Sequence, residues 1–161
     1  MKRYLCYICI IAIILSFCGC ANTSTKLKKP AKFYYLTDPE NYQSNAITPE
    51  LRESSEYTDD LRSLIQVYLE GPTSSLYINP FPQKTIVQDI TVNNVTVEII
   101  LNDAFSQLNE VELTSACACL TMTILDLTER QRLIITTLDN VGNVVYTTSM
   151  TKEHILLSDT D

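Results

Sequence analysis

One short segment, TDDLRSLIQVYLEGP at residues 58–72, restricts the fold of this chain more than any other. Its apolar residues recur every three or four positions, which predicts an amphipathic α-helix with a single apolar stripe. Thr58 is placed to cap the first turn, and the acidic residues at 59 and 60 suit the positive end of the helix dipole. Gly71-Pro72 ends the helix. Such a stripe has to pack against another layer of the protein.

The segments on either side of this helix predict one strand and two loops. Residues 32–37, KFYYLT, are rich in aromatic and β-branched side chains, as strands are. Residues 40–57 are polar and unperiodic and contain Pro49, so we expect a long loop with one helical turn after Thr48. Residues 73–83 contain two prolines and are also expected to form a loop.

Residues 84–101 predict a β-hairpin. The runs KTIVQDITV and VTVEIIL flank Asn93-Asn94, and asparagines tolerate the positive φ angles that a tight turn needs. In the second run the alternate residues from Val95 to Leu101 share an apolar face, and Thr96 and Glu98 lie on the opposite face. We therefore expect one side of the hairpin to pack and the other to face water.

A second helix and a last pair of strands complete the order. Residues 111–129 place Leu113, Ala116, Cys117, Leu120 and Ile124 along one helical stripe. Residues 132–138 and 144–150 read as strands joined by a turn. The order β-α-β-β-α-β-β predicts a single α+β domain, with two helices packed on one face of a small mixed or antiparallel sheet.

The N-terminal region indicates where the protein works. Two basic residues, Lys2 and Arg3, precede an uncharged apolar run that suits a signal peptide and is short for a membrane span of roughly 20 residues. The run ends in Gly19-Cys20, which resembles the lipobox of bacterial lipoproteins. The resemblance implies cleavage after residue 19, a lipid on Cys20 and attachment to the extracytoplasmic face of the cell membrane. An uncleaved membrane anchor is the alternative.

Charge narrows the choice of partners. Residues 20–32 are polar, include four lysines and read as a flexible tether. The net charge is −7 for the whole chain, −9 without Lys2 and Arg3, and −13 for residues 33–161. So acidic a body repels nucleic acid, which excludes it as a partner. Only three glycines occur, so the chain has no glycine-rich phosphate loop.

Cys117 and Cys119 are the only cysteines beyond the tether. Two residues apart on a helix, they point away from each other, so we expect no disulfide between them. We interpret Cys117 as a small core side chain, because no cationic residue lies near it in sequence. With the single His154 these two thiols cannot supply a four-ligand metal site, and we expect no metal or cofactor.

An ordered set of residues between positions 64 and 105 carries a family resemblance. The set comprises the helix end Leu69, Gly71 and Pro72, the turn residues Pro82 and Thr85, and Phe105 after the hairpin. It resembles the GerMN domain of sporulation and germination proteins over residues 33–150, which leaves 151–161 as a polar tail. The resemblance implies a lipoprotein of a spore-forming or related Gram-positive bacterium. It also implies a fold like that of ring-building domains, which dock on other proteins, and no catalytic residue.

We therefore expect a non-enzymatic interaction module in a sporulation, germination or cell-envelope assembly. The candidate interaction surface is the wet hairpin face with Thr91, Thr96 and Glu98, together with an exposed edge strand near Val144 and Tyr146. An open edge can accept a strand from a protein partner or from a second copy of the chain. A simply solvated sheet face explains the same residues equally well.

Two other functions remain open. A peptidoglycan- or small-ligand-binding lipoprotein would use an aromatic groove, although core packing explains the same side chains: Phe33, Tyr34, Tyr35, Tyr77 and Phe81. A hydrolase would use a carboxylate pair, either Asp59 with Asp60 or Glu110 with Glu112. Both pairs lie at expected helix starts, where acidic residues are favoured anyway. We therefore expect no enzymatic activity.

Overall fold

The computed structural model describes residues 30–38, 40, 46–52 and 60–155. Cys20, most of the tether, Thr58, Asp59 and the end of the tail lie outside these residues. The elements, in chain order, are β1 (Ala31–Thr37), β2 (Ile47–Arg52), α2 (Leu61–Glu70), β3 (Tyr77–Ile78), β4 (Val87–Val92), β5 (Thr96–Asn102), the 3-10 helix η2 (Asp103–Gln107), α3 (Glu110–Thr128), β6 (Arg132–Leu138), β7 (Val144–Met150) and the 3-10 helix η3 (Lys152–His154).

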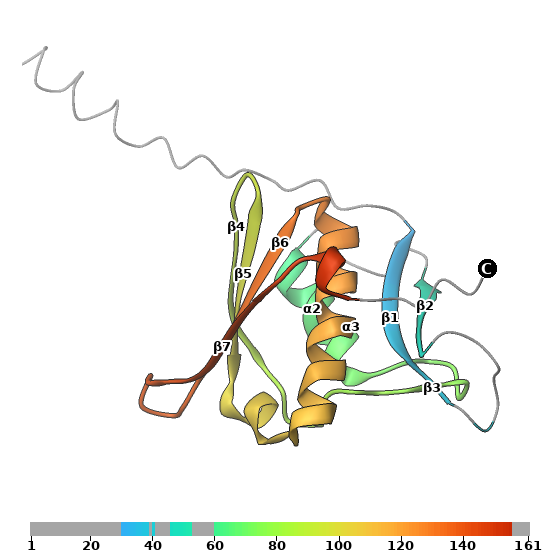
Figure 1. Cartoon of the computed structure of the whole chain (residues 1–161), viewed down its shortest axis with the longest axis horizontal. Coiled ribbons are helices and arrows are strands. Elements are labelled where there is room, and N and C mark those ends of the chain that lie inside the picture. Colours follow the sequence, from blue (N-terminus) through green and yellow to red (C-terminus); the bar gives the residue numbers. More distant parts are fainter. Residues whose placement is uncertain (1–29, 39, 41–45, 53–59, 156–161) are drawn as a thin grey trace, which may run out of the picture.

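The elements form two sheets with the helices between them (Figure 1). One sheet has three antiparallel strands in the order β2-β1-β3. The other has the order β4-β5-β6-β7, in which β5 and β6 are parallel and the other pairs antiparallel. The predicted α+β class is confirmed. The small sheet that the sequence predicts is accompanied by a second one, because β1 pairs with two strands that were expected to be loops.

The first helix, α2, forms as the sequence predicts. It buries the stripe Leu61, Leu64, Ile65, Tyr68 and Leu69. Asp60 is its N-cap, and the carboxylate accepts hydrogen bonds from the backbone N–H groups of Arg62 at 3.4 Å and Ser63 at 3.1 Å. The capping residue therefore stands two positions later than the expected Thr58.

The second helix, α3, is buried on all sides rather than along one stripe. Every residue from Ala116 to Thr128 except Asp126 is buried, because α3 contacts both β1 and β6. A helix that is apolar all round belongs in a core or in a membrane. It is the one described helix long and apolar enough to cross a membrane, and its burial between two sheets identifies it as a core helix.

Strand β2 corrects the prediction of a loop with a helical turn after Thr48. It pairs antiparallel with β1 and forms the outer edge of the three-stranded sheet, where Pro49 is tolerated because no further strand needs its N–H. Its alternation is the reverse of the usual one. Glu50 and Arg52 are buried, whereas Leu51 between them is 63% exposed.

The hairpin of β4 and β5 has the two faces that the sequence predicts. Val97, Ile99 and Leu101 are buried, and Glu98 is exposed. Val95 departs from the expected packing face, since it belongs to the turn before β5 and is 50% exposed.

Candidate functional site

The motif at the end of α2, Leu69-x-Gly71-Pro72, has a structural explanation. Gly71 has φ +118°, and a Cβ at this position would lie 2.9 Å from Nδ2 of Asn79. That Asn79 amide donates a hydrogen bond to the carbonyl of Leu69 at 3.2 Å. Glycine is required because only it has both the backbone freedom and the space.

A buried ion pair fixes the loop that follows. Nη2 of Arg52 lies 2.7 Å from Oε2 of Glu50, and both side chains are 8% exposed. Arg52 also donates to the carbonyl of Gly71 at 2.7 Å. The Glu50 carboxylate accepts from the N–H of Thr73 at 3.0 Å, from its hydroxyl at 2.7 Å and from the N–H of Ser74 at 3.0 Å. Each charge is thus paired and hydrogen-bonded, which buried charges require.

These contacts shift the acidity of Glu50. Burial by itself raises the pKa of the carboxyl, but the hydrogen bonds from Thr73, Arg52 and Ser74 and the positive charge of Arg52 outweigh burial. The pKa of Glu50 is therefore lowered from its ordinary value, and the group is charged at neutral pH.

Three of the five aromatic residues that suggested a sugar groove lie in the core. Phe33 and Tyr35 are fully buried and Phe81 is 5% exposed. The Tyr68 ring contacts all three, with centroid distances of 5.0, 5.0 and 4.9 Å. Tyr34 and Tyr77 are half-buried. Core packing therefore explains Phe33, Tyr35 and Phe81.

The remaining motif residues also have structural roles. Phe105 is fully buried and stacks on Phe81 at 6.4 Å between ring centroids. Thr85 is 4% exposed, and its N–H donates to the carbonyl of Pro82 at 3.0 Å, which closes the turn before β4. None of these groups is placed for chemistry on an external substrate.

The three predicted interaction residues of the hairpin, Thr91, Thr96 and Glu98, lie on the four-stranded sheet, on the side away from the helices. We call this side the outer sheet face. Thr91 is paired with Glu98, and both are exposed. Thr96 is half-buried and lies opposite Arg132. The same face carries aliphatic side chains that the sequence analysis had not selected, and the pairing register identifies them as Ile100, Ile134 and Leu138.

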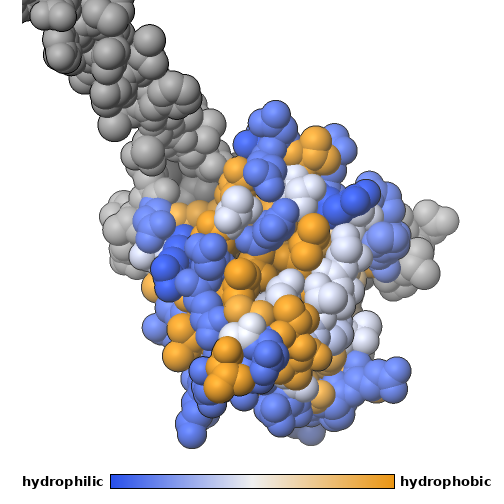
Figure 2. Space-filling model, turned by 90° about the vertical axis from the view of Figure 1, so that its left-hand side faces the viewer, coloured by the Kyte–Doolittle hydropathy of each residue, from blue (hydrophilic) through white to orange (hydrophobic). Residues whose placement is uncertain are grey.

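These aliphatic residues give the outer sheet face an apolar centre. Figure 2 shows this side of the molecule, where apolar residues gather in the middle and polar residues surround them. Ile100, Ile134 and Leu138 are half-buried, and Val145 beside them is 50% exposed. The expected wet face is therefore mixed, with polar residues at its border.

The two predicted residues of β7 point in different directions. Val144 is 62% exposed. Tyr146 is half-buried, and its hydroxyl lies 3.8 Å from Sγ of Cys117 on the helix side of the sheet. Burial is the main reason that the pKa of the Tyr146 hydroxyl is raised. The side chain of Tyr146 therefore packs inward, while the backbone of β7 forms the sheet edge.

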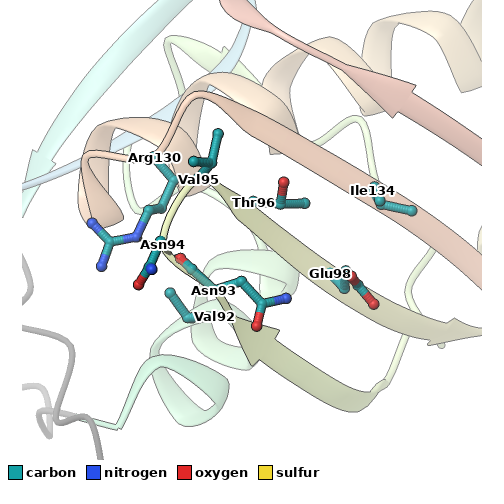
Figure 3. A pocket seen from close by; sticks show the side chains of 8 residues that line it. All are labelled: Val92, Asn93, Asn94, Val95, Thr96, Glu98, Arg130 and Ile134. Carbon is teal, nitrogen blue, oxygen red and sulfur yellow. Dashed lines mark hydrogen bonds between the residues drawn. The ribbon is translucent and has the colours of Figure 1, made fainter.

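A shallow depression of about 540 Å³ lies at the hairpin turn (Figure 3). Its polar side chains include Asn93, Asn94, Glu98 and Arg130. Arg130 is engaged locally, since Nε donates to the carbonyl of Asn93 at 2.9 Å and Nη1 to that of Thr128 at 3.2 Å. The depression thus holds one carboxylate beside an arginine that braces the turn, and no nucleophile with an adjacent base.

The other candidate reactive groups are occupied or inert. Burial raises the pKa of Cys117 to about 11 and that of Cys119 to about 12, so neither thiol is a nucleophile at neutral pH. Both are unpaired, as predicted. Glu112 accepts from the N–H of Asn109 in the capping box of α3. Within residues 30–38, 40, 46–52 and 60–155, no cluster of histidine, cysteine or acidic residues could hold a metal ion.

Sequence reasoning missed Glu50 and Arg52, which join the motif loop to β2. The available signal was their spacing, since two opposite charges two residues apart lie on one face of a strand. It missed Asn79 as well, because the carbonyl that its amide reaches, that of Leu69, lies ten residues earlier and leaves no local pattern.

Comparison with known proteins agrees with the fold. A family model described as Germane, sporulation and spore germination, matches residues 32–140. A solved structure, the tandem GerMN domains of the sporulation protein GerM from Bacillus subtilis, is similar with a TM-score of 0.52 and 12% identity. The match covers 84% of this chain and 50% of the other, so this chain spans about half the length of that structure. A search of curated protein sequences gives no significant match. Because the family model covers well over half of its residues, the chain belongs to the Germane family of sporulation and spore germination domains.

Proposed function

We propose that this protein is a lipid-anchored, non-enzymatic docking module on the extracytoplasmic face of the membrane, acting in a sporulation, germination or related envelope assembly. Membership of the Germane family supports the cellular process. The lipobox-like Gly19-Cys20 after an uncharged apolar run supports the anchor. The outer sheet face is the docking surface.

One observation carries the proposal: an apolar centre on the solvent side of the sheet in a strongly acidic body. A sheet face that meets only water normally alternates to polar residues. Here Ile100, Ile134 and Leu138 interrupt that pattern, and Val144 and Val145 extend the apolar area at 62% and 50% exposure. Contiguous exposed apolar area with a polar border is typical of protein interfaces.

The described side chains favour a protein partner over a glycan. A sugar-stacking groove would use accessible aromatic rings, and three of the five candidates, Phe33, Tyr35 and Phe81, are buried in the core. The outer sheet face instead offers aliphatic side chains bordered by Thr91 and Glu98, which suit the side chains of another protein. Retention on purified peptidoglycan would argue against this choice.

The anchor is tested by changing Cys20. The variant Cys20→Ser keeps the size of the side chain and removes the sulfur that carries the lipid. We expect the wild-type chain to incorporate labelled palmitate and to sediment with membranes, and the variant to lose the label. A labelled Cys20→Ser chain would contradict the proposal.

Docking is tested by placing a photoreactive residue at Glu98 on the outer sheet face of the full chain in living cells. The matched control is the same residue at Ser75, which is exposed in the loop after α2. We expect a cross-linked protein adduct from position 98 and none from position 75. Equal adducts from both positions, or none from position 98, would refute the outer sheet face as the docking surface.

A further inference from the structure

The four sheet edges differ in how they are protected against pairing with another strand. Natural proteins protect edges with prolines, charges, bulges or short strands. The β2 edge carries Pro49, and β3 is two residues long. The β4 edge carries Asp89 and a register irregularity between Val87 and Asp89. Strand β7, with the sequence VVYTTSM, also has a register irregularity near its start, between Val144 and Tyr146, but it is the one described edge strand with seven residues and neither charge nor proline.

We propose that β7 pairs antiparallel with β7 of a second copy of this chain. Among the described residues no strand lies on the outer side of β7, so its outward N–H and C=O groups are available for pairing. Two copies related by a two-fold axis would join their four-stranded sheets into one sheet of eight strands. The proposal rests on the proposed membrane anchor only for the local concentration of the two copies.

We place the centre of the pairing at Thr147, which is exposed on the outer sheet face and lies beyond the register irregularity at Val144–Tyr146. Thr147 of one copy then faces Thr147 of the other. Threonines directly opposite each other are a favourable cross-strand pair. Thr147 already has such a neighbour within the chain, since its Oγ1 lies 3.2 Å from Oγ1 of Thr136.

Charge explains why two copies would meet at this edge rather than elsewhere. Residues 33–161 carry a net charge of −13, so two copies repel each other wherever acidic surfaces approach. Strands β6 and β7 contain no acidic residue, and their single charge is that of Arg132. By contrast, β4 and β5 carry the exposed Asp89 and Glu98. The β7 edge is therefore where two acidic bodies meet with least repulsion.

The geometry also suits two anchored chains. A two-fold axis perpendicular to the extended sheet keeps the three-stranded sheets of both copies on the same side. Both β1 strands, which follow the tether, then lie on that side and can face one membrane. Confinement to one leaflet raises the effective concentration of each copy for the other.

The test is disulfide trapping in membranes with the full chain. Residues directly opposite in an antiparallel pair have Cα atoms about 4.5–5.5 Å apart, within reach of a disulfide. We expect Thr147→Cys to shift to dimer mass on mild oxidation. The matched control is Thr91→Cys, an exposed threonine on the opposite edge strand, which should stay monomeric. The native Cys117 and Cys119 are buried and should not react.

The outcomes separate this proposal from the proposed function. A monomeric Thr147→Cys chain, or equal dimers from Thr91→Cys, would overturn the pairing. An adduct of Thr147→Cys with a different protein would also overturn it, while supporting docking in general.

A second pair of variants tests the pairing without engineered thiols. A charge on the open edge should block it, so detergent-solubilised Thr147→Lys should have monomer mass where the wild-type chain has dimer mass. Thr91→Lys should remain dimeric. If the wild-type chain is monomeric, or if Thr147→Lys remains dimeric, β7 does not pair in this way.

Discussion

The two sheets of this domain differ in where their polar groups are used. The three-stranded sheet buries the Glu50–Arg52 ion pair and binds the loop after α2 through Gly71, Thr73 and Ser74. The four-stranded sheet buries apolar side chains on its inner side and presents aliphatic and hydroxyl side chains outward. The polar residues of the three-stranded sheet stabilise the fold, whereas the outer side of the four-stranded sheet remains accessible to a binding partner.

The residues of the family motif and the residues of the exposed surface therefore have different roles. The residues that carry the family resemblance, such as Gly71, Thr85 and Phe105, are buried or conformationally constrained. They identify the fold and say nothing about the partner. The docking surfaces that we propose, the outer sheet face and β7, contain none of these motif residues.

The largest expected effect comes from breaking the ion pair in the three-stranded sheet. Glu50→Ala would leave the buried Arg52 without its partner and three donors without an acceptor, at a cost of about 3–5 kcal/mol in the free energy of unfolding. Urea denaturation measures this cost. The matched control Glu98→Ala, on the exposed face, should change the free energy by about 0.5 kcal/mol or less. Similar costs for the two variants would mean that the sheets do not differ as described.

A smaller effect is expected from Gly71→Ala. The substitution forces an alanine to φ +118° and brings its Cβ to 2.9 Å from Asn79, so about 1–3 kcal/mol of stability should be lost. The control is Gly142→Ala, where φ is +89° and nothing lies within 4 Å of the new Cβ. The difference between the two losses in thermal or urea unfolding isolates the steric contact with Asn79. No difference would show that backbone strain alone explains the glycine.

The sequence predicted the four-stranded part of the fold well because its signals are local. The amphipathic stripe of α2, the Asn93-Asn94 turn and the alternation in β5 each depend on neighbouring residues. The three-stranded sheet is different. Strand β2 has its charged residues inside and Leu51 outside. A prediction that places apolar residues in the core and charged residues in solvent therefore assigns the two faces of β2 the wrong way round. The ion pair between Glu50 and Arg52, together with their bonds to Gly71, Thr73 and Ser74, makes that arrangement stable.

The predicted stripe of α3 was too narrow for a related reason. Periodicity in the sequence can indicate a helix with one buried face. It cannot indicate that a second sheet packs on the other face, because that depends on tertiary contacts. Once β1 covers that side, residues such as Thr121, Thr123 and Met122 are buried too. The candidate surface was incomplete in the same way, because Ile100 and Ile134 become a patch only through strand pairing.

Lowering the pH should weaken the three-stranded sheet selectively. The folded pKa of Glu50 lies below its ordinary value of 4.5, so its contribution to stability is complete above that value and is lost as the pH falls through the folded pKa. The difference in unfolding free energy between the wild-type chain and Glu50→Gln should therefore shrink as the pH falls below 4.5. Other acidic groups titrate equally in both chains and cancel. If the difference in unfolding free energy stays constant with pH, the negative charge of Glu50 does not stabilise the loop after α2.

The smallest effect on the stability of the single chain is expected at the β7 edge. A small effect there would show that the edge residue does not pack within its own domain. Val144 is 62% exposed, so Val144→Ser should change the unfolding free energy by about 0.5 kcal/mol or less. Val111→Ser, at a position 77% exposed at the start of α3, is a control of the same type.

Both chains should unfold like the wild type in dilute solution, where association is absent. At concentrations that favour association only the Val144 variant should lose stability relative to the wild type, because a bound copy stabilises the folded state by mass action. A concentration-independent difference would mean that Val144 packs within its own domain and that the two sheets are equally closed.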